Sequence, residues 1–134
     1  MAGVWDANIK AVYPTNPNLS VTVDTVTIGA AFDVVADVEI GSRLNEVVDS
    51  YTLSVSVVNL SQANVLVSNK PLVAVPIAPQ VNTPRTDLLR VHFPAGWVAA
   101  DEGDVLEIVA SYKVTAGVNT DVSSLQSSTF VVVA

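Results

Sequence analysis

The ten residues AFDVVADVEI, Ala31–Ile40, decide the fold of this chain. Apolar side chains recur at every second position from Phe32 to Ile40, whereas three carboxylates and one valine, Val35, occupy the positions between them. A period of two is the pattern of a β-strand with one buried face and one exposed face. The stretch therefore predicts a strand whose carboxylate face either lies beside a source of cations or faces water.

Other segments show the same alternation, and the sequence predicts them as further strands around one shared core. The clearest are Tyr51–Leu60, Thr86–Phe93 and Val105–Val114. The shorter segments 64–68 and 72–77 lie in a region that is crowded with prolines. Because proline has no backbone N–H, it is confined to the edges of sheets, and we expect these two segments to be edge strands.

Three other stretches complete the expected order. In Leu19–Ile28 the apolar positions change parity halfway, which is typical of a β-bulge or of a strand that crosses between two sheets. The segment 115–126 is polar and is predicted to be a connection. The last residues, 127–134, are predicted to be the terminal strand.

The composition supports a single all-β domain. A chain of 134 residues corresponds to one domain and can bury a substantial core without covalent cross-links. Its 28 valines favour sheet, because valine is stiff at its first torsion and fits a pleated surface. There is no cysteine, which excludes disulfides, thiolate zinc sites and a cysteine nucleophile, and leaves the redox compartment open.

The charge balance argues against two classes of partner. The net charge is −7, and the six basic residues are scattered, whereas a nucleic-acid or anionic-membrane partner requires clustered lysine and arginine. No apolar run approaches the roughly 18 residues of a membrane-spanning helix, so we expect no membrane insertion. The first ten residues have no basic region before an apolar core, so we also expect no signal peptide; the localisation stays open.

Part of the chain resembles the immunoglobulin-like sandwiches. The resemblance rests on Leu89-x-Val91, then the corner Asp101-Glu102-Gly103-Asp104, then the strand Val105–Val114. In such domains this is a strand, a corner and a second core strand. The resemblance implies an antiparallel β-sandwich of about seven or eight strands in two sheets with Greek-key connections.

The chain departs from antibody domains at their hallmark positions. Val105 stands where the corner tyrosine would be, Glu107 stands where the second cysteine would be, and Tyr51–Leu60 contains no tryptophan. The expectation is therefore a generic sandwich, and this fold carries no function by itself.

The N-terminal segment 1–18 is expected to differ from the sandwich domain proper, 19–134. Its apolar residues suit a short edge strand, a strap along the sandwich, or an arm that docks on a neighbouring subunit. In the last case the interface residues would be Trp5, Ile9, Val12 and Tyr13. The alternative for Trp5 is that it fills a gap in the core of its own chain.

The single histidine, His92, shares a predicted strand face with Arg90. If Ala31–Ile40 pairs antiparallel with Thr86–Phe93, these two side chains lie opposite some of the carboxylates of the first strand. We expect a cross-strand ion pair of about 0.2–1 kcal/mol, rather than a pair of catalytic carboxylates or a histidine-based triad. No Gly-x-Ser-x-Gly motif and no phosphate-binding glycine loop is present.

The acidic corner contains the weak candidates for a calcium site, Asp101, Glu102 and Asp104, because hard oxygen ligands on a tight loop can bind Ca²⁺. Further ligands would have to come from elsewhere, with Asp121 the candidate. The alternative, which we favour, is a solvated turn in which Gly103 adopts a positive φ. No other metal and no cofactor is expected.

Low charge combined with apolar strands predicts a protein that functions through its surface. Only 14% of the residues are charged, against about 25% in ordinary soluble domains, and exposed apolar patches mark contact with a partner. The terminal strand adds Phe130, Val131 and Val133 to the interface candidates, because it is apolar on both faces, as in a central strand or one covered by a partner.

We therefore expect a non-enzymatic structural or assembly module of the particle, tail or filament type, which self-associates or docks on another protein. A monomer with a polar but uncharged surface is the competing interpretation of the same composition. A second functional hypothesis is a module that binds carbohydrate or peptide with the loops 59–64, 94–104 and 115–126, and with Trp97 as its platform.

Overall fold

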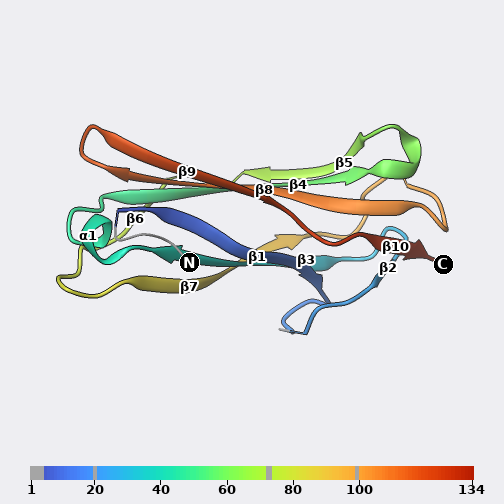
Figure 1. The fold of residues 1–134 in the computed structure, drawn as a ribbon. Helices are drawn as coiled ribbons and strands as arrows, with labels where there is room; N and C mark the ends of the chain where they lie inside the picture. Colours follow the sequence, from blue (N-terminus) through green and yellow to red (C-terminus); the bar gives the residue numbers. More distant parts are fainter. Residues whose placement is uncertain (1–4, 20, 72–73, 99) are drawn as a thin grey trace.

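The computed structural model describes residues 5–19, 21–71, 74–98 and 100–134, and these form two β-sheets packed face to face (Figure 1). The elements in chain order are β1 (Ala7–Thr15), β2 (Thr25–Thr27), β3 (Phe32–Ile40), α1 (Ser42–Asn45), β4 (Ser50–Asn59), the 3-10 turn η1 (Leu60–Gln62), β5 (Val65–Pro71), β6 (Val75–Pro76), β7 (Arg85–Phe93), β8 (Val105–Ala116), β9 (Asn119–Gln126) and β10 (Phe130–Val133). The chain is an immunoglobulin-like β-sandwich, as the sequence predicted.

The small sheet has the order β1-β3-β7 and is built around the organising strand β3. Both of its pairs are antiparallel, and the register of β3 with β7 places Asp33 opposite His92 and Ile40 opposite Arg85. The predicted pairing of these two segments is therefore confirmed. Within this sheet β1 lies at an edge, since it pairs only with β3.

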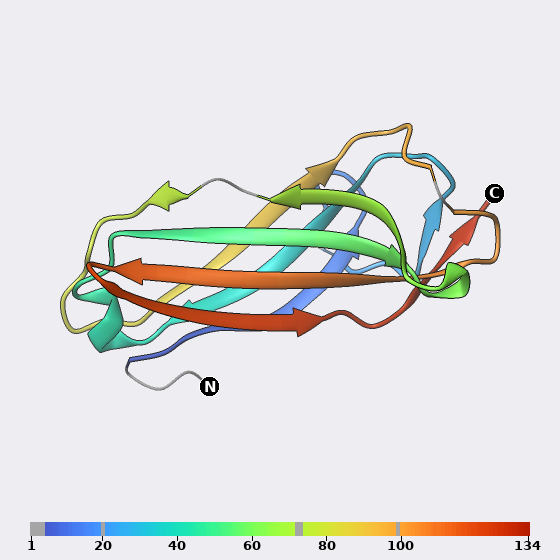
Figure 2. The same ribbon diagram turned by 90° about the horizontal axis from the view of Figure 1, so that it is seen from above.

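The large sheet has the order β2-β10-β8-β4-β5, with β6 beside β4 and β9 beside β8. In Figure 2 its long strands β4, β8 and β9 lie above the small sheet, whose strands cross beneath them at an angle. The predicted edge strands 64–68 and 72–77 correspond to β5 and β6 at one edge, although residues 72 and 73 lie outside the described residues. The terminal strand β10 lies between β2 and β8 and is thus a central strand.

One strand was not predicted. The segment expected to be a polar connection contains β9, which forms a hairpin with β8 through the turn at Gly117, where φ is 61°. Its sequence, NTDVSSLQ, has almost no apolar alternation, because two of its inward side chains, Asp121 and Ser123, bind the edge of β1, and only Leu125 packs against the apolar core. Hydrophobic periodicity therefore could not reveal it.

The core lies between the two sheets and consists of the inward side chains of both. Phe32 stacks on Phe93 of the same sheet with ring centroids 5.1 Å apart, and it meets Phe130 of the opposite sheet at 6.5 Å. From the large sheet, Leu53 and Ile108 are among the fully buried side chains. Burial of alternate residues on both sheets is the main stabilising term of the fold.

The parity change in 19–28 corresponds to a crossing between sheets. The chain leaves the small sheet at Thr15, passes over its outer side, and enters the large sheet as β2, which pairs in parallel with β10. Among the described residues, the two helical elements are a single turn each, and no helix is both long and apolar enough to span a membrane.

Candidate functional site

The most concentrated polar group in the described structure is centred on Asp33, on the outer side of β3. Its Oδ1 lies 2.6 Å from Nδ1 of His92, and its Oδ2 accepts hydrogen bonds from Nη1 of Arg90 at 2.7 Å and from the backbone N–H of Asn18 at 3.0 Å. Asp33 is only 1% exposed. The predicted ion pair therefore exists, but the expectation of a weak surface pair was wrong, because the carboxylate is buried.

Arg90 connects this carboxylate to the segment that crosses between the sheets. Its Nη2 donates to the carbonyl of Leu19 at 2.6 Å, and its Nη1 also donates to Oγ1 of the buried Thr15 at 3.3 Å. Burial by itself would raise the pKa of Asp33. The hydrogen bonds from Asn18, His92 and Arg90 outweigh it, and the pKa of Asp33 lies below its usual value.

This arrangement is best explained as a structural tie. An Asp–His pair can orient an imidazole for proton transfer, but such chemistry also requires a nucleophile or a substrate cleft beside the ring. Here the two carboxylate oxygens are taken up by donors that hold β7 and the 16–19 segment against β3. The side chain of His92 is 57% exposed, which fits the predicted surface position.

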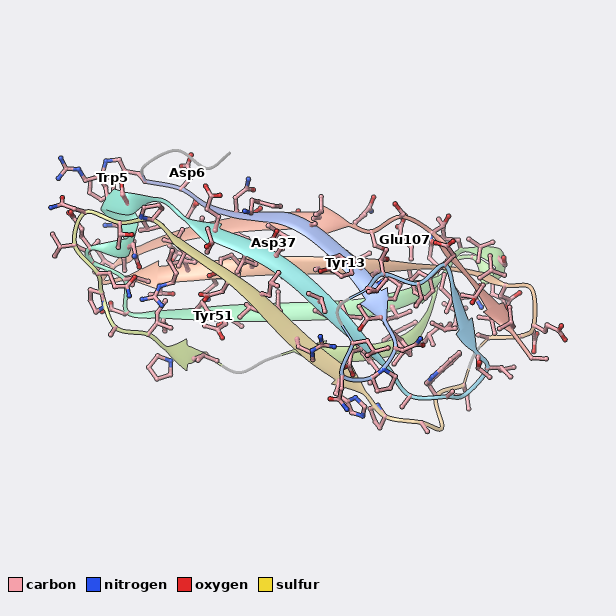
Figure 3. All side chains as sticks on the ribbon, turned by 90° about the horizontal axis from the view of Figure 1, so that it is seen from below. Trp5, Asp6, Tyr13, Asp37, Tyr51 and Glu107 are labelled. Carbon is pink, nitrogen blue, oxygen red and sulfur yellow. The ribbon has the colours of Figure 1, made fainter. Side chains whose placement is uncertain are left out.

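The remaining carboxylates of β3 lie beside a cation, which is the first of the two alternatives that the sequence left open. Nζ of Lys10, on β1, lies 3.7 Å from Asp37 and 3.6 Å from Glu39. In Figure 3, which views the molecule from below, Asp37 lies on β3 of the small sheet. The outer face of the small sheet is therefore charged and internally paired.

The acidic corner is a hydrogen-bonded turn. Oδ2 of Asp104 accepts from Nδ2 of Asn59 at 2.8 Å, from Nε2 of Gln62 at 2.8 Å and from the N–H of Asp101 at 2.8 Å. The first two of these bonds tie the corner to the end of β4 and to η1, and together the three lower the pKa of Asp104. Gly103 has φ 89°, in agreement with the favoured solvated turn.

The structure does not gather the proposed calcium ligands. Asp121 lies on β9 opposite Val114, near one end of β8, whereas the acidic corner lies directly before Val105 at the other end. The nine residue steps from Val105 to Val114 correspond to about 30 Å along the strand. Asp121 instead accepts a hydrogen bond from the N–H of Ala7 at 2.6 Å. Among the described residues, no three His, Asp or Glu side chains converge in an arrangement that could bind a metal ion.

The structure separates the predicted interface residues into two groups. Ile9, Val12 and Phe130 lie in the core of this chain, which removes them from the interface candidates. Ile9 and Val12 were selected because apolar residues near the N-terminus suit a docking arm, and Phe130 because the terminal strand is apolar on both faces. However, β1 and β10 are integral strands of the sandwich. Tyr13, Val131 and Val133 are partly accessible, and Trp5 is 60% exposed.

Trp97, the proposed ligand platform, is half-buried and held by its own chain. Its Nε1 donates to the carbonyl of Ala30 at 2.6 Å, and its ring packs edge-on against Phe32 at 6.0 Å. The three loops proposed to act together also lie apart, since 59–64 and 94–104 are at the β10 end of the sandwich and the β8–β9 turn is at the α1 end.

Trp5 lines a small groove at the α1 end of the molecule (Figure 3). The groove has a volume of about 230 Å³, and its walls combine the apolar Leu44 and Val47 with the polar Asn119 and Thr120. The sequence singled out Trp5 but gave no sign of this groove, because its walls come from α1 and from the β8–β9 turn.

The least charged surface of the described structure is the outer face of the large sheet. We define this face, the large-sheet face, by the outward side chains of β4, β8 and β9. Cross-strand pairing arranges them in rows, such as Thr52–Lys113–Val122 and Ser54–Ser111–Ser124. The members are Thr52, Ser54, Ser56, Val58, Glu107, Val109, Ser111, Lys113, Thr115, Thr120, Val122, Ser124 and Gln126.

Only Glu107 and Lys113 are charged within the large-sheet face, although the chain has 13 acidic and six basic residues. Neither forms an ion pair with a described side chain, in contrast to the paired charges of the small sheet. The sequence showed that Ser and Thr alternate with buried residues and therefore face outward. It did not show that these outward residues form one face across three strands, because β9 was not predicted.

Three comparisons with known proteins gave two similar solved structures and no sequence relative. The sequence matches no protein-family model and no curated protein. One similar solved structure is a CARDB domain from Pyrococcus furiosus in complex with di-metal ions; it has a TM-score of 0.46 and 14% identity, and the match covers 99% of this chain and 94% of that one. Another is a β-glucuronidase of glycoside hydrolase family 2, with a TM-score of 0.46, 13% identity and 94% of this chain covered.

The present chain spans 12% of the β-glucuronidase. At this level of similarity the two structures assign neither a function nor a site residue to the present chain.

Proposed function

We propose that this chain is a non-enzymatic assembly module, of the type that forms particles, tails or filaments, and that it associates with further copies of itself through the large-sheet face. The observation that carries the proposal is the near absence of charge on this face in a chain of net charge −7. Depletion of charged residues is the compositional mark of the buried centre of a protein interface.

The size of the face supports the same proposal. The three neighbouring strands β4, β8 and β9 give a width of about 14 Å, and the twelve residues of β8 give a length of about 40 Å. The product is about 570 Å² per partner, or about 1,100 Å² for two copies, which exceeds the roughly 1,000 Å² of total buried area expected of a biological interface.

The proposal is tested by one charged substitution on each face. Val109→Lys places a charge at the centre of the large-sheet face, and Leu88→Lys is the matched control, because Leu88 is 64% exposed on the outer face of the small sheet. Sedimentation velocity should show that the wild type and Leu88→Lys associate as concentration rises, whereas Val109→Lys stays at 14.0 kDa. A wild type that stays at 14.0 kDa at every concentration would overturn the proposal.

Carbohydrate binding at the Trp5 groove is the second candidate function. An exposed indole beside amide and hydroxyl side chains is the type of surface on which a sugar ring can stack and form hydrogen bonds. The test is a titration of Trp97→Phe with an oligosaccharide panel, since tryptophan emission then comes from Trp5 alone. A change that Trp5→Ala abolishes supports this function, and unchanged emission throughout the panel rejects it.

A further inference from the structure

We infer that two copies pack their large-sheet faces together about a two-fold axis that lies between the faces, level with Ala110 of β8, so that Glu107 of each copy pairs with Lys113 of the other. This inference rests on the proposed function and adds the partner geometry. Its starting point is the position of the two charges of the face. They lie on the same strand, with the same parity, three residues on either side of Ala110.

A two-fold axis makes this charge pattern complementary to itself. An axis that lies between the two faces, perpendicular to β8, stacks β8 on its copy in the antiparallel direction. Residue 107 then lies over residue 113 of the second copy, and the reverse contact follows from the symmetry. An axis parallel to β8 would instead place Glu107 over Glu107 and Lys113 over Lys113, which like-charge repulsion disfavours.

The same operation brings large outward side chains over small ones. Position 109 lies over position 111, so that Val109 meets Ser111 of the second copy. On β9, Gln126 and Ser124 lie beside these two residues in the same rows, so Gln126 meets Ser124 of the second copy. Alternation of larger and smaller side chains lets two flat sheets interdigitate at the usual separation of about 10 Å.

The length of the two charged side chains fits this separation. Glu107 is half-buried, and Lys113 is exposed at the next-to-last outward position of β8. Stacked sheets rotate by about 30° relative to one another. Over the three residues between Ala110 and either charge, about 10 Å, this rotation shifts the partners sideways by about 5 Å, which a lysine side chain can span.

Charge reversal tests the pairing without changing the core. Glu107→Lys and Lys113→Glu each leave only like charges opposed across the axis, so each variant alone should dimerise at least about tenfold more weakly than the wild type. Mixed together they should form a heterodimer, because the first variant then presents two lysines and the second two glutamates. The double variant Glu107→Lys/Lys113→Glu should dimerise again on its own.

The mixture is analysed by native mass spectrometry, with one variant labelled with ¹⁵N so that heterodimers differ in mass from homodimers. Circular dichroism melting shows whether each single variant is folded. Weak homodimers with a strong heterodimer support the inference. If the single variants dimerise like the wild type while Val109→Lys does not, the two-fold pairing is rejected and the proposed function stands. If the wild type is a monomer throughout, the proposed function itself fails.

Discussion

Nδ1 of His92 lies 2.6 Å from Oδ1 of Asp33, across the β3–β7 pair. The carboxylate of Asp33 also contacts Arg90, and it is almost completely buried. A charge in this position is stabilised only by its partners. The outer side of the small sheet is therefore held by a polar tie, whereas its inner side is held by apolar packing.

Removing the charge of Asp33 should destabilise the fold. Asp33→Asn keeps the shape of the side chain but leaves Arg90 without its carboxylate. We expect a loss of about 2 kcal/mol in the free energy of unfolding in urea, which is less than for a fully buried pair because His92 and part of Arg90 are exposed. The control is Asp37→Asn, because the partner of Asp37, Lys10, is partly exposed. If Asp37→Asn lowered the free energy of unfolding by as much as Asp33→Asn, the special role of Asp33 would be contradicted.

The contribution of Asp33 should also depend on pH in a defined direction. Its pKa is lowered in the folded chain, whereas the unfolded value is about 3.9. The stabilisation is therefore fully present above about pH 4 and is lost as the pH falls through the lowered folded-state pKa. The difference in unfolding free energy between the wild type and Asp33→Asn should narrow below about pH 4. A difference that stays constant down to about pH 2 would show that the charge is not its source.

The two tryptophans should report opposite environments. In Trp5→Phe the remaining indole is Trp97, which donates to Ala30 and packs on Phe32, so its emission should be blue-shifted and poorly quenched by acrylamide. In Trp97→Phe the remaining indole is the exposed Trp5, and emission should be red-shifted and readily quenched. We expect Trp97→Phe to cost about 1–2 kcal/mol of unfolding free energy and Trp5→Phe almost none. Equal quenching of both variants would contradict this assignment.

The side chains of β9 should protect the free edge of β1. Oδ2 of Asp121 accepts from the N–H of Ala7, and Oγ of Ser123 accepts from the N–H of Ile9 at 3.1 Å. Asp121→Ala and Ser123→Ala should accelerate amide hydrogen exchange at Ala7 and Ile9, respectively, and cost about 1 kcal/mol each. Ser124→Ala, on the outward side of the same strand, is the control. Unchanged exchange at both amides would show that β1 is held by β3 alone.

The strands that face the core on one side could be predicted from the sequence. The alternation in β3 and β8 is carried by apolar residues such as Val34 and Ile108, and burial between two sheets is what that alternation reflects. The pairing of β3 with β7 also followed, because a sandwich order was available from the resemblance. Within the candidate site, Arg90 and His92 were correctly expected opposite a carboxylate of β3, and the structure shows that this carboxylate is Asp33.

What could not be predicted depends on contacts between distant segments. The burial of Asp33 results from the 16–19 segment, which lies over it, and no local pattern encodes that position. β9 was missed because its inward residues Asp121 and Ser123 are polar, and the backbone N–H groups that they bind lie on the distant strand β1. Without β9, the width of the large-sheet face could not be known either. The register between strands decides which side chains share a face, and only the folded chain reveals it.

The association of two large-sheet faces is tested most directly by isotope-filtered nuclear Overhauser effects in an equimolar mixture of ¹³C-labelled and unlabelled wild-type chains. We predict contacts between copies from the methyl groups of Val109 and Val58 to protons of the same face on the other copy, including Ser111. Intermolecular contacts that arise instead at Leu88, on the small sheet, or a concentrated sample that shows none from Val109, would contradict the account.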